Sequence, residues 1–282
     1  MNIILAEHFG MCFGVRDAIA EAEQLAAQGP LTILGELVHN PVVRDRLAAA
    51  GVHEATLDDL ATARTPQVMI TAHGASDAQR RTWRDAGFKL ADGTCPLVHR
   101  AHQQLRALVA SGYFPVVIGQ AGHVEVRGLT GDFPHAVVLG AIGDIARLPA
   151  NVERFGVISQ TTQPIERVQE IVAALRSARP AAEVRFCDTV CQPTKNRQTA
   201  LQKLLTICDT IVVVGGHHSN NTRQLVDAAR AAGRRAIHVE RPDELHEASL
   251  RDAKDVGLTA GTSTLKETVA AVHERLLTIA AA

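Results

Sequence analysis

The 282-residue sequence predicts an α/β protein built from three similar units. Two observations lead to this fold class. Short apolar runs rich in β-branched residues recur along the chain and alternate with amphipathic helical stretches, which is typical of βαβ units with parallel sheets. In addition, one pattern of cysteine, helix, strand and glycine occurs three times, and internal repetition of this kind indicates repeated structural units.

The apolar runs are nearly continuous rather than alternating, as expected for strands that are buried on both faces of a parallel sheet. We expect strands at residues 2–5, 31–34, 68–71, 115–118, 136–139, 155–158, 183–186, 210–214, 236–239 and 255–259. Helical stripes lie between them, one from Leu97 to Val109 and another from Leu201 to Cys208.

Each repeat begins at a cysteine and contains two polar loops. The cysteines are Cys12, Cys95 and Cys191, and the next strand of each repeat ends at Gly35, Gly119 and Gly215. The first polar loop follows this glycine, and the second follows a later strand, at residues 70–74, 158–163 and 258–263. We therefore expect units at residues 12–94, 95–190 and 191–282.

The N-terminal segment, residues 1–11, completes the third unit in this scheme. A strand leads directly into Cys95 and into Cys191, and the strand at residues 2–5 leads into Cys12 in the same way. We expect this strand to join the sheet of the third unit, so that the repeat closes on itself as a pseudo-threefold ring.

Composition and charge exclude several classes of protein. Lys and Arg number 29 against 30 for Asp and Glu, and aromatic residues make up 3%, so neither nucleic acid nor an anionic membrane is an expected partner. No apolar run approaches a membrane span and no signal peptide is evident, so we expect a cytoplasmic protein. The five cysteines point to metal binding or catalysis rather than a disulfide framework.

The three repeated cysteines form a candidate metal site. Open α/β sheets bind ligands outside the carboxyl ends of their strands, and ring closure would direct all three cysteines and all six polar loops toward one cavity. Spacing alone leaves zinc and an iron–sulfur cluster both open. Three cysteines on a four-iron cluster would leave one iron free for substrate. Cys187 and Cys208 lie outside the repeat, and we assign both to core packing.

The polar loops carry neutral donors and histidines and no lysine, a set suited to a diphosphate or a polycarboxylate. The candidates are His39, Asn40, His73, His123, Glu125, Thr161, Thr162, Ser219, Asn220, Asn221, Thr262 and Ser263. Glu125 is the only carboxylate in these loops besides Glu36, and it would be a proton donor if burial raises its pKa. We expect most other histidines, His102 and His238 among them, to be solvated or satisfied, and leave His217 and His218 open.

Taken together, these motifs resemble a known family. They are GMCFGVRDAI at Cys12, ELVHN at His39, TAHG at His73, DGTCPLV at Cys95, GHVEV at Glu125, SQTT at Thr161, DTVCQPTKNRQ at Cys191, GGHHSNNTRQL at Ser219 and TAGTS at Ser263. In this order, and over essentially the whole chain, the sequence is similar to 4-hydroxy-3-methylbut-2-enyl diphosphate reductase, the terminal step of the non-mevalonate isoprenoid pathway.

The resemblance implies a trefoil of three α/β domains around a central [4Fe–4S] cluster with one open iron. It assigns the cluster to Cys12, Cys95 and Cys191, and catalysis to Glu125, Thr161 and His123. It assigns the substrate diphosphate to His39, His73, His123, Ser219, Asn220, Asn221 and Ser263. The implied reaction is the two-electron reductive dehydroxylation of an allylic diphosphate to isopentenyl and dimethylallyl diphosphate, with a ferredoxin- or flavodoxin-type electron donor as partner.

Two other functions stay open on the residues alone. One is a cluster enzyme that acts on a substrate without a diphosphate, for which the His, Ser and Asn set would have no clear purpose. The other is a non-catalytic iron–sulfur sensor. Such a sensor should carry an effector surface, such as a basic helix or a dimer stripe, and the sequence shows neither.

Overall fold

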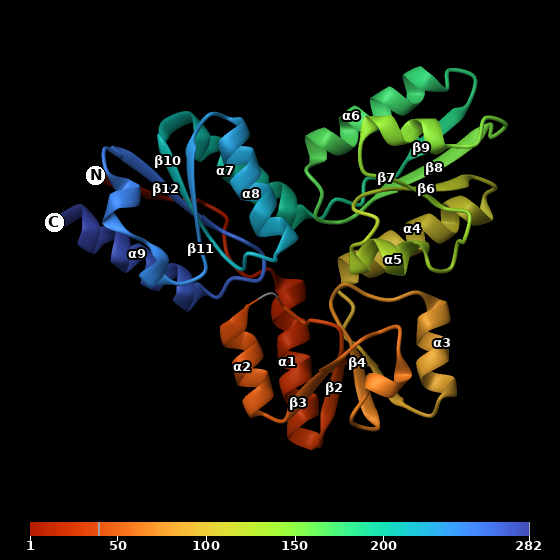
Figure 1. Ribbon diagram of the computed structural model, residues 1–282. Helices are drawn as coiled ribbons and strands as arrows, with labels where there is room; N and C mark the ends of the chain where they lie inside the picture. Colours follow the sequence, from red (N-terminus) through yellow and green to blue (C-terminus); the bar gives the residue numbers. More distant parts are fainter. Residues whose placement is uncertain (39, 282) are drawn as a thin grey trace. The chain divides into compact units, whose positions relative to one another are not determined.

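A computed structural model describes residues 1–38 and 40–281, and within them it contains three four-stranded parallel sheets (Figure 1). The strands are β1 (Asn2–Leu5), β2 (Leu31–Leu34), β3 (Val52–Ala55), β4 (Gln67–Ile70), β5 (Lys89–Asp92), β6 (Phe114–Ile118), β7 (Val137–Leu139), β8 (Arg154–Ser159), β9 (Glu183–Phe186), β10 (Thr210–Val214), β11 (Arg235–Val239) and β12 (Asp255–Ala260). The helices are α1 (Phe13–Gln28), α2 (Pro41–Ala49), α3 (Asp77–Asp85), α4 (Pro96–Ala110), α5 (Val124–Thr130), α6 (Ile165–Ala178), α7 (Gln192–Ile207), α8 (Asn220–Ala231) and α9 (Lys266–Ala281). The predicted α/β fold class is confirmed.

The chain forms two compact units. One comprises Met1–Arg16, Val38–Asp45 and Gln192–Ala282, and it contains the sheet β1-β12-β10-β11. The other comprises Asp17–Leu37 and Arg46–Cys191, and it contains the sheets β3-β2-β4-β5 and β7-β6-β8-β9.

Within the described residues, no helix has both the length and the apolar character needed to cross a membrane.

All three sheets share one strand order. Strands β2–β5 form the first repeat and β6–β9 the second, and in each the second strand lies at the edge beside the first. The third repeat follows the same order with β10, β11 and β12, and β1 takes the place of its fourth strand. β1 pairs in parallel with β12, Asn2 opposite Asp255 and Leu5 opposite Leu258. The prediction that the N-terminal strand joins the third sheet is confirmed.

The three repeats also share backbone hydrogen bonds at the carboxyl ends of their strands. The amides of Gly35, Gly119 and Gly215 donate to the last carbonyl of the neighbouring edge strand, that of Ala55 (2.8 Å), Leu139 (3.0 Å) and Val239 (2.9 Å). A turn then closes the second polar loop of each repeat, with the amides of Gly74, Gln163 and Thr264 donating to the carbonyls of Thr71, Gln160 and Gly261. The internal repetition of the sequence therefore corresponds to repeated loop geometry.

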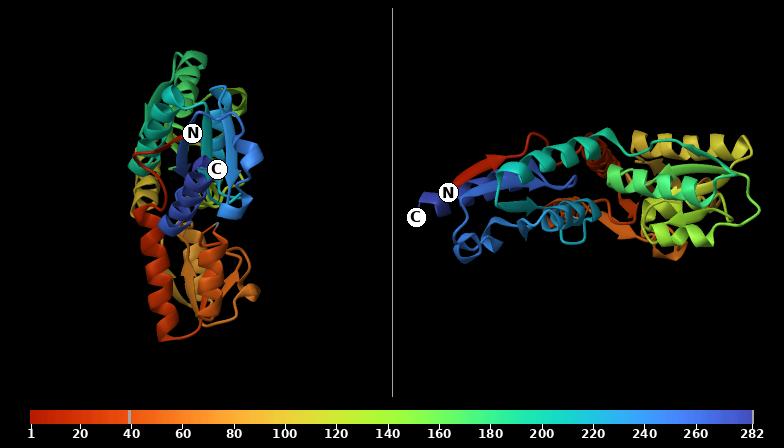
Figure 2. Two further views of the ribbon diagram at one scale, coloured as in Figure 1. Left: turned by 90° about the vertical axis from the view of Figure 1, so that its left-hand side faces the viewer. Right: turned by 90° about the horizontal axis from the view of Figure 1, so that it is seen from above.

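The sheets of the second and third repeats are covered by helices on both faces. Figures 1 and 2 show this for the sheet formed by β6–β9. On one face of that sheet, Val117 and Ile158 pack with residues of α4 and α5. On the other face, Val116 and Val157 pack with residues of α6. Because both faces are buried, successive strand residues must all be apolar, which explains the continuous apolar runs.

Strand β3 was not predicted. Its sequence, Val-His-Glu-Ala, has one large apolar residue, and only Val52 is buried. β3 is an edge strand, where fewer side chains need an apolar environment, so its pattern gives a weak signal. β4 ends at Ile70, one residue before the expected end, because Thr71 already belongs to the turn of the polar loop.

Gly156 allows α4 to pack closely on β8. A Cβ atom at this position would lie 2.9 Å from the Cβ atoms of Leu108 and Tyr113, which cannot move without the backbone. We expect Gly156→Ala to lower the free energy of unfolding by about 1–3 kcal/mol. Urea unfolding of the purified variant measures this. Gly143→Ala is the control, since no atom lies within 4 Å of the added methyl group, and equal stability of the two variants would contradict the close packing.

Candidate active site

The three repeated cysteines occupy equivalent backbone positions. Their amides donate to the carbonyl two residues beyond the end of the neighbouring strand, that of Thr262 for Cys12 (3.0 Å), Ala72 for Cys95 (3.1 Å) and Thr161 for Cys191 (2.9 Å). Each cysteine directly precedes a helix, α1, α4 or α7, and each thiol is partly exposed. Cysteine side chains in such equivalent positions are candidate metal ligands.

Glu125 is a buried carboxyl group in the second repeat. It lies in the first turn of α5 and is 1% exposed. Its Oε1 accepts from the Thr161 amide at 2.6 Å, and its Oε2 accepts from the Thr161 hydroxyl at 3.1 Å. Burial raises the pKa of Glu125 to about 7, although both hydrogen bonds from Thr161 act to lower it. The group can therefore hold a proton near neutral pH.

His123 caps the same helix and fixes its own tautomer. Its Nδ1 accepts a hydrogen bond from the Glu125 amide at 3.1 Å, so the neutral ring carries its proton on Nε2. The His73 ring lies edge-on to the His123 ring, with 5.4 Å between the centroids. Gly128 of α5 makes this approach possible, because a Cβ there would lie 3.3 Å from the backbone of Ala75. The structure thus brings His73, His123, Glu125 and Thr161 together in one unit.

The other unit brings together a second group of polar side chains. Ser219 caps α8, and its hydroxyl accepts from the Thr222 amide at 3.4 Å. Asn221 Oδ1 accepts from the Thr262 amide at 3.0 Å, and Asn40 Nδ2 donates to the Ser263 carbonyl at 3.2 Å.

Three polar atoms of this group have no hydrogen-bond partner among the described residues. They are Asn220 Nδ2, Thr222 Oγ1 and Ser263 Oγ, and all three side chains are buried. Buried polar atoms are normally paired, because an unpaired one costs about 1–3 kcal/mol. Amide and hydroxyl groups can donate to an anion, and the N-terminus of α8 adds a favourable dipole. This group therefore has the chemistry of an anion site.

Glu125 and Asn221 are equivalent in the repeat. Each is the second residue of a helix, after the capping residues His123 and Ser219. Each accepts a hydrogen bond from the amide of a threonine in the second polar loop of its repeat. One position therefore carries a carboxyl group in the second repeat and a neutral amide in the third, with the same backbone contact.

Some candidates are placed differently from the prediction or lie outside the description. His39 lies outside the described residues. His102 was expected to be solvated or satisfied, which is wrong, since it is 4% exposed and its Nε2 has no partner among the described residues. Burial on α4 lowers its pKa to about 4. His238 is satisfied as expected, with Nε2 2.7 Å from the Gly215 carbonyl oxygen.

The two remaining cysteines pack in the core. Cys208 is 1% exposed and belongs to the apolar cluster between the third sheet and helices α7 and α8. Cys187 packs against the cluster beneath α4 and α5. Within the part of the chain that the structure describes, no three His, Cys, Asp or Glu side chains form a metal-binding group.

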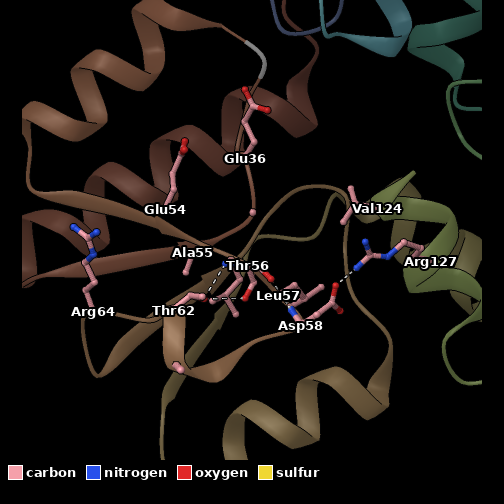
Figure 3. Close-up of a pocket in the computed structure, with 13 residues that line it drawn as sticks. Glu36, Glu54, Ala55, Thr56, Leu57, Asp58, Thr62, Arg64, Val124 and Arg127 are labelled. Carbon is pink, nitrogen blue, oxygen red and sulfur yellow. Dashed lines mark hydrogen bonds and ion pairs between the residues drawn. The ribbon is translucent and has the colours of Figure 1, made fainter. Parts of the chain in front are cut away.

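A cavity of about 660 Å³ lies in the second of the two compact units (Figure 3). Its wall includes Glu54 and Arg64 on one side, and the Asp58–Arg127 ion pair on the other. It also includes Val124, the residue between His123 and Glu125. None of the predicted site residues that the structure describes lines the cavity.

Comparison with known proteins identifies relatives along the whole chain. The model of the family described as LytB protein matches residues 3–277. A relative from Aquifex aeolicus, named 4-hydroxy-3-methylbut-2-enyl diphosphate reductase, is 33% identical over 98% of this chain and 96% of its own length. A relative of the same name from Citrifermentans bemidjiense is 36% identical over 99% of this chain and 98% of its own length.

Solved structures give the same result. The E-1-hydroxy-2-methyl-but-2-enyl-4-diphosphate reductase from Plasmodium falciparum matches with a TM-score of 0.90 and 28% identity, over 98% of this chain and 88% of that chain. A structure of (E)-4-hydroxy-3-methyl-but-2-enyl diphosphate reductase, described as the terminal enzyme of the non-mevalonate pathway, matches with a TM-score of 0.70 and 32% identity, over 99% of this chain and all of that chain. The match of the family model to almost every residue shows that this chain belongs to the LytB family.

Proposed function

We propose that this chain is a 4-hydroxy-3-methylbut-2-enyl diphosphate reductase, an oxidoreductase of the non-mevalonate isoprenoid pathway. Family membership supports the activity, since the curated relatives carry this name. The observation that carries the proposal is the buried Glu125 carboxyl group, held by Thr161 with a pKa of about 7. Reductive removal of a hydroxyl group needs a proton donor of this kind, because hydroxide is a poor leaving group.

The substrate's diphosphate would bind to the two groups of neutral donors. The unpaired atoms of Asn220 and Ser263, with Ser219 and Asn221 at the N-terminus of α8, form one group. His73 and His123 form the other, and the Nε2–H of His123 is a donor of the kind that an anionic oxygen accepts. His39 completes the proposed set. Hydrogen bonds to charged groups contribute about 1.5–3 kcal/mol each, so several together hold the substrate in a defined orientation.

The three repeated cysteines fit a [4Fe–4S] cluster. They are three partly exposed thiols in one equivalent backbone setting, Cys12, Cys95 and Cys191, each at the start of a helix. They supply three ligands, which leaves one iron open. When bound, the cluster would pass electrons from the donor to the substrate and offer a Lewis-acidic site for the substrate hydroxyl.

The protein's own residues would control the protons. Glu125 donates a proton to the hydroxyl group, which leaves as water, and Thr161 holds the carboxyl group in place. Two electrons enter from the donor, and a second proton adds to one end of the allylic carbon chain. Addition at one end gives isopentenyl diphosphate and at the other dimethylallyl diphosphate, which balances two electrons and two protons.

Three further features belong to this proposal. The electron donor would be a ferredoxin- or flavodoxin-type protein, and the enzyme would act in the cytoplasm. The domain boundaries would follow the cysteines, at residues 12–94, 95–190 and 191–282 with residues 1–11. The common strand order of the three sheets supports this division.

An anaerobic assay tests the proposed function. The reconstituted protein is incubated with reduced viologen and 4-hydroxy-3-methylbut-2-enyl diphosphate, and both C5 diphosphates are measured by mass spectrometry. Formation of both products with loss of viologen colour supports the proposal. A loaded protein that oxidises no viologen with this substrate would overturn it.

The cluster ligands can be separated from the packing cysteines. We expect Ser in place of Cys12, Cys95 or Cys191 to abolish or strongly reduce the visible thiolate-to-iron absorption and the bound iron. Cys187→Ala and Cys208→Ala are the controls, since both thiols pack in the core, and each should retain the full spectrum. A Cys95→Ser protein with full iron and sulfide content would contradict the ligand assignment.

Glu125→Gln should abolish turnover without disturbing the site. A Gln side chain can still accept from the Thr161 amide, as the neutral Asn221 does from Thr262, but it cannot deliver a proton. We expect kcat to fall by about 10²–10⁴-fold, with normal cluster content. His123→Ala is the contrasting variant, because it removes a proposed diphosphate donor and should raise KM as well. Near-normal kcat of Glu125→Gln would show that another group is the acid.

Burial of Glu125 also predicts how stability depends on pH. The pKa of Glu125 in the folded state is about 7, above the unfolded value of 4.5. Because the folded state binds this proton more tightly, protonation of Glu125 adds to the free energy of unfolding. This contribution is fully present below about pH 4.5 and is lost as the pH rises through 7. Between pH 5 and 8, the free energy of unfolding measured in urea should fall in the native protein through this effect. Glu125→Gln should lack this part of the fall. Identical pH profiles for the two proteins would contradict the raised pKa.

A further inference from the structure

Arg80 is a buried cation that the proposed chemistry does not use. It lies in α3, whose other residues are mostly exposed, yet Arg80 itself is 6% exposed. A buried charge is costly unless it is paired and hydrogen-bonded, so its partners show what it does.

The guanidinium group of Arg80 contacts two loops and the strand between them. Its Nη1 donates to the Ala75 carbonyl. Its Nε lies 3.1 Å from Asp92 Oδ2, and its Nη2 donates to the Thr94 hydroxyl at 3.0 Å. Thr94 is in turn tied to Asp92, through its amide at 3.2 Å and through its hydroxyl.

Both loops carry proposed site residues. Ala75 follows the turn Thr71–Gly74, which contains His73. Thr94 directly precedes Cys95, and the Cys95 amide donates to the Ala72 carbonyl at 3.1 Å. Together with the bond from the Gly93 amide to the Ile70 carbonyl (3.0 Å), this backbone hydrogen bond joins the Cys95 loop to the neighbouring strand end and its loop, where Arg80 contacts both loops.

The other repeats fix their cysteine loops by different means. Before Cys191, the Thr189 hydroxyl donates to the Ser159 carbonyl at 2.6 Å and accepts from the Ser159 amide at 2.9 Å, so one short side chain joins the loop to the neighbouring strand. Before Cys12, the buried Arg197 donates to the Gly10 carbonyl. The Cys95 loop has Gly93 at the position of Thr189 and needs a group from outside its own strand and loop.

We propose that Arg80 is a positioning residue, which holds the Cys95 loop and the His73 loop in one fixed geometry. The inference rests on the proposed function for the roles of Cys95 and His73, but the linkage itself is a property of the protein without cluster or substrate. Lysine cannot replace Arg80, because only the planar guanidinium fork reaches a carboxylate, a hydroxyl and a carbonyl at the same time.

The experiment measures amide hydrogen exchange in cluster-free protein. Arg80→Lys should accelerate exchange of the Cys95 amide by about tenfold or more, the effect of losing one hydrogen bond to a charged group. The Cys191 amide, which donates to Thr161, is the internal reference and should be unchanged. Arg84→Lys is the control variant, since Arg84 is an exposed arginine on the same helix. Equal acceleration at Cys95 and Cys191 would mean general destabilisation and would overturn the proposal.

Thr94→Val gives a milder second variant with a nearly identical shape. It removes the hydroxyl group that Arg80 contacts and should also accelerate exchange at Cys95 but not at Cys191. In loaded enzyme, Arg80→Lys should lower kcat/KM by about 10²-fold and alter the electron paramagnetic resonance spectrum, because two site groups move together. If the native protein has no reductase activity, the exchange experiment still decides the role of Arg80. Exchange at Cys95 that is unchanged in both variants would refute it.

Discussion

The hydrogen bond from each repeated cysteine to the loop of the neighbouring strand is the contact on which the site depends. It occurs three times with nearly the same length, at Cys12, Cys95 and Cys191. It requires parallel neighbouring strands, because only then do a strand end and the next loop meet at the same edge of the sheet. The parallel sheets in turn require apolar residues on both faces and helices to cover them. The composition of the strands, the order of the elements and the placement of the thiols therefore follow from a single geometric requirement.

Much of this arrangement could be predicted because it is encoded locally. Continuous apolar strands, a glycine at each strand end and a cysteine before each helix are visible in any one repeat, and comparison of the repeats predicts that β1 completes the third sheet. Strand β3 was missed because an edge strand needs few apolar residues. Arg80 was missed for a different reason. It lies in a helix in which Trp83 is the one large apolar residue, and only the tertiary structure shows that Asp92 and Thr94 surround the guanidinium group.

The equivalence of Glu125 and Asn221 shows how repeated structure can hold asymmetric chemistry. Both side chains accept a hydrogen bond from a threonine amide, so the backbone tolerates a carboxyl group or an amide at this position. Burial then makes the difference. A buried carboxyl group retains its proton near neutral pH, whereas a buried amide has no proton to give. One repeat can therefore specialise in proton donation and another in holding an anion, without any change in the fold.

The pairing of β1 with β12 also constrains the order in which the chain can assemble. Asn2 and Asp255 are hydrogen-bonded across 253 residues, so β1 has no strand partner until β12 has been synthesised. By contrast, the sheet β7-β6-β8-β9 lies entirely within residues 114–186, so each of its strands finds its partners within a short stretch of chain. Long-range pairing of this kind is slow, and a waiting apolar strand is exposed to aggregation. The polar group around Ser219 and Ser263, which includes the loop after β12, would thus form only once β12 has been synthesised.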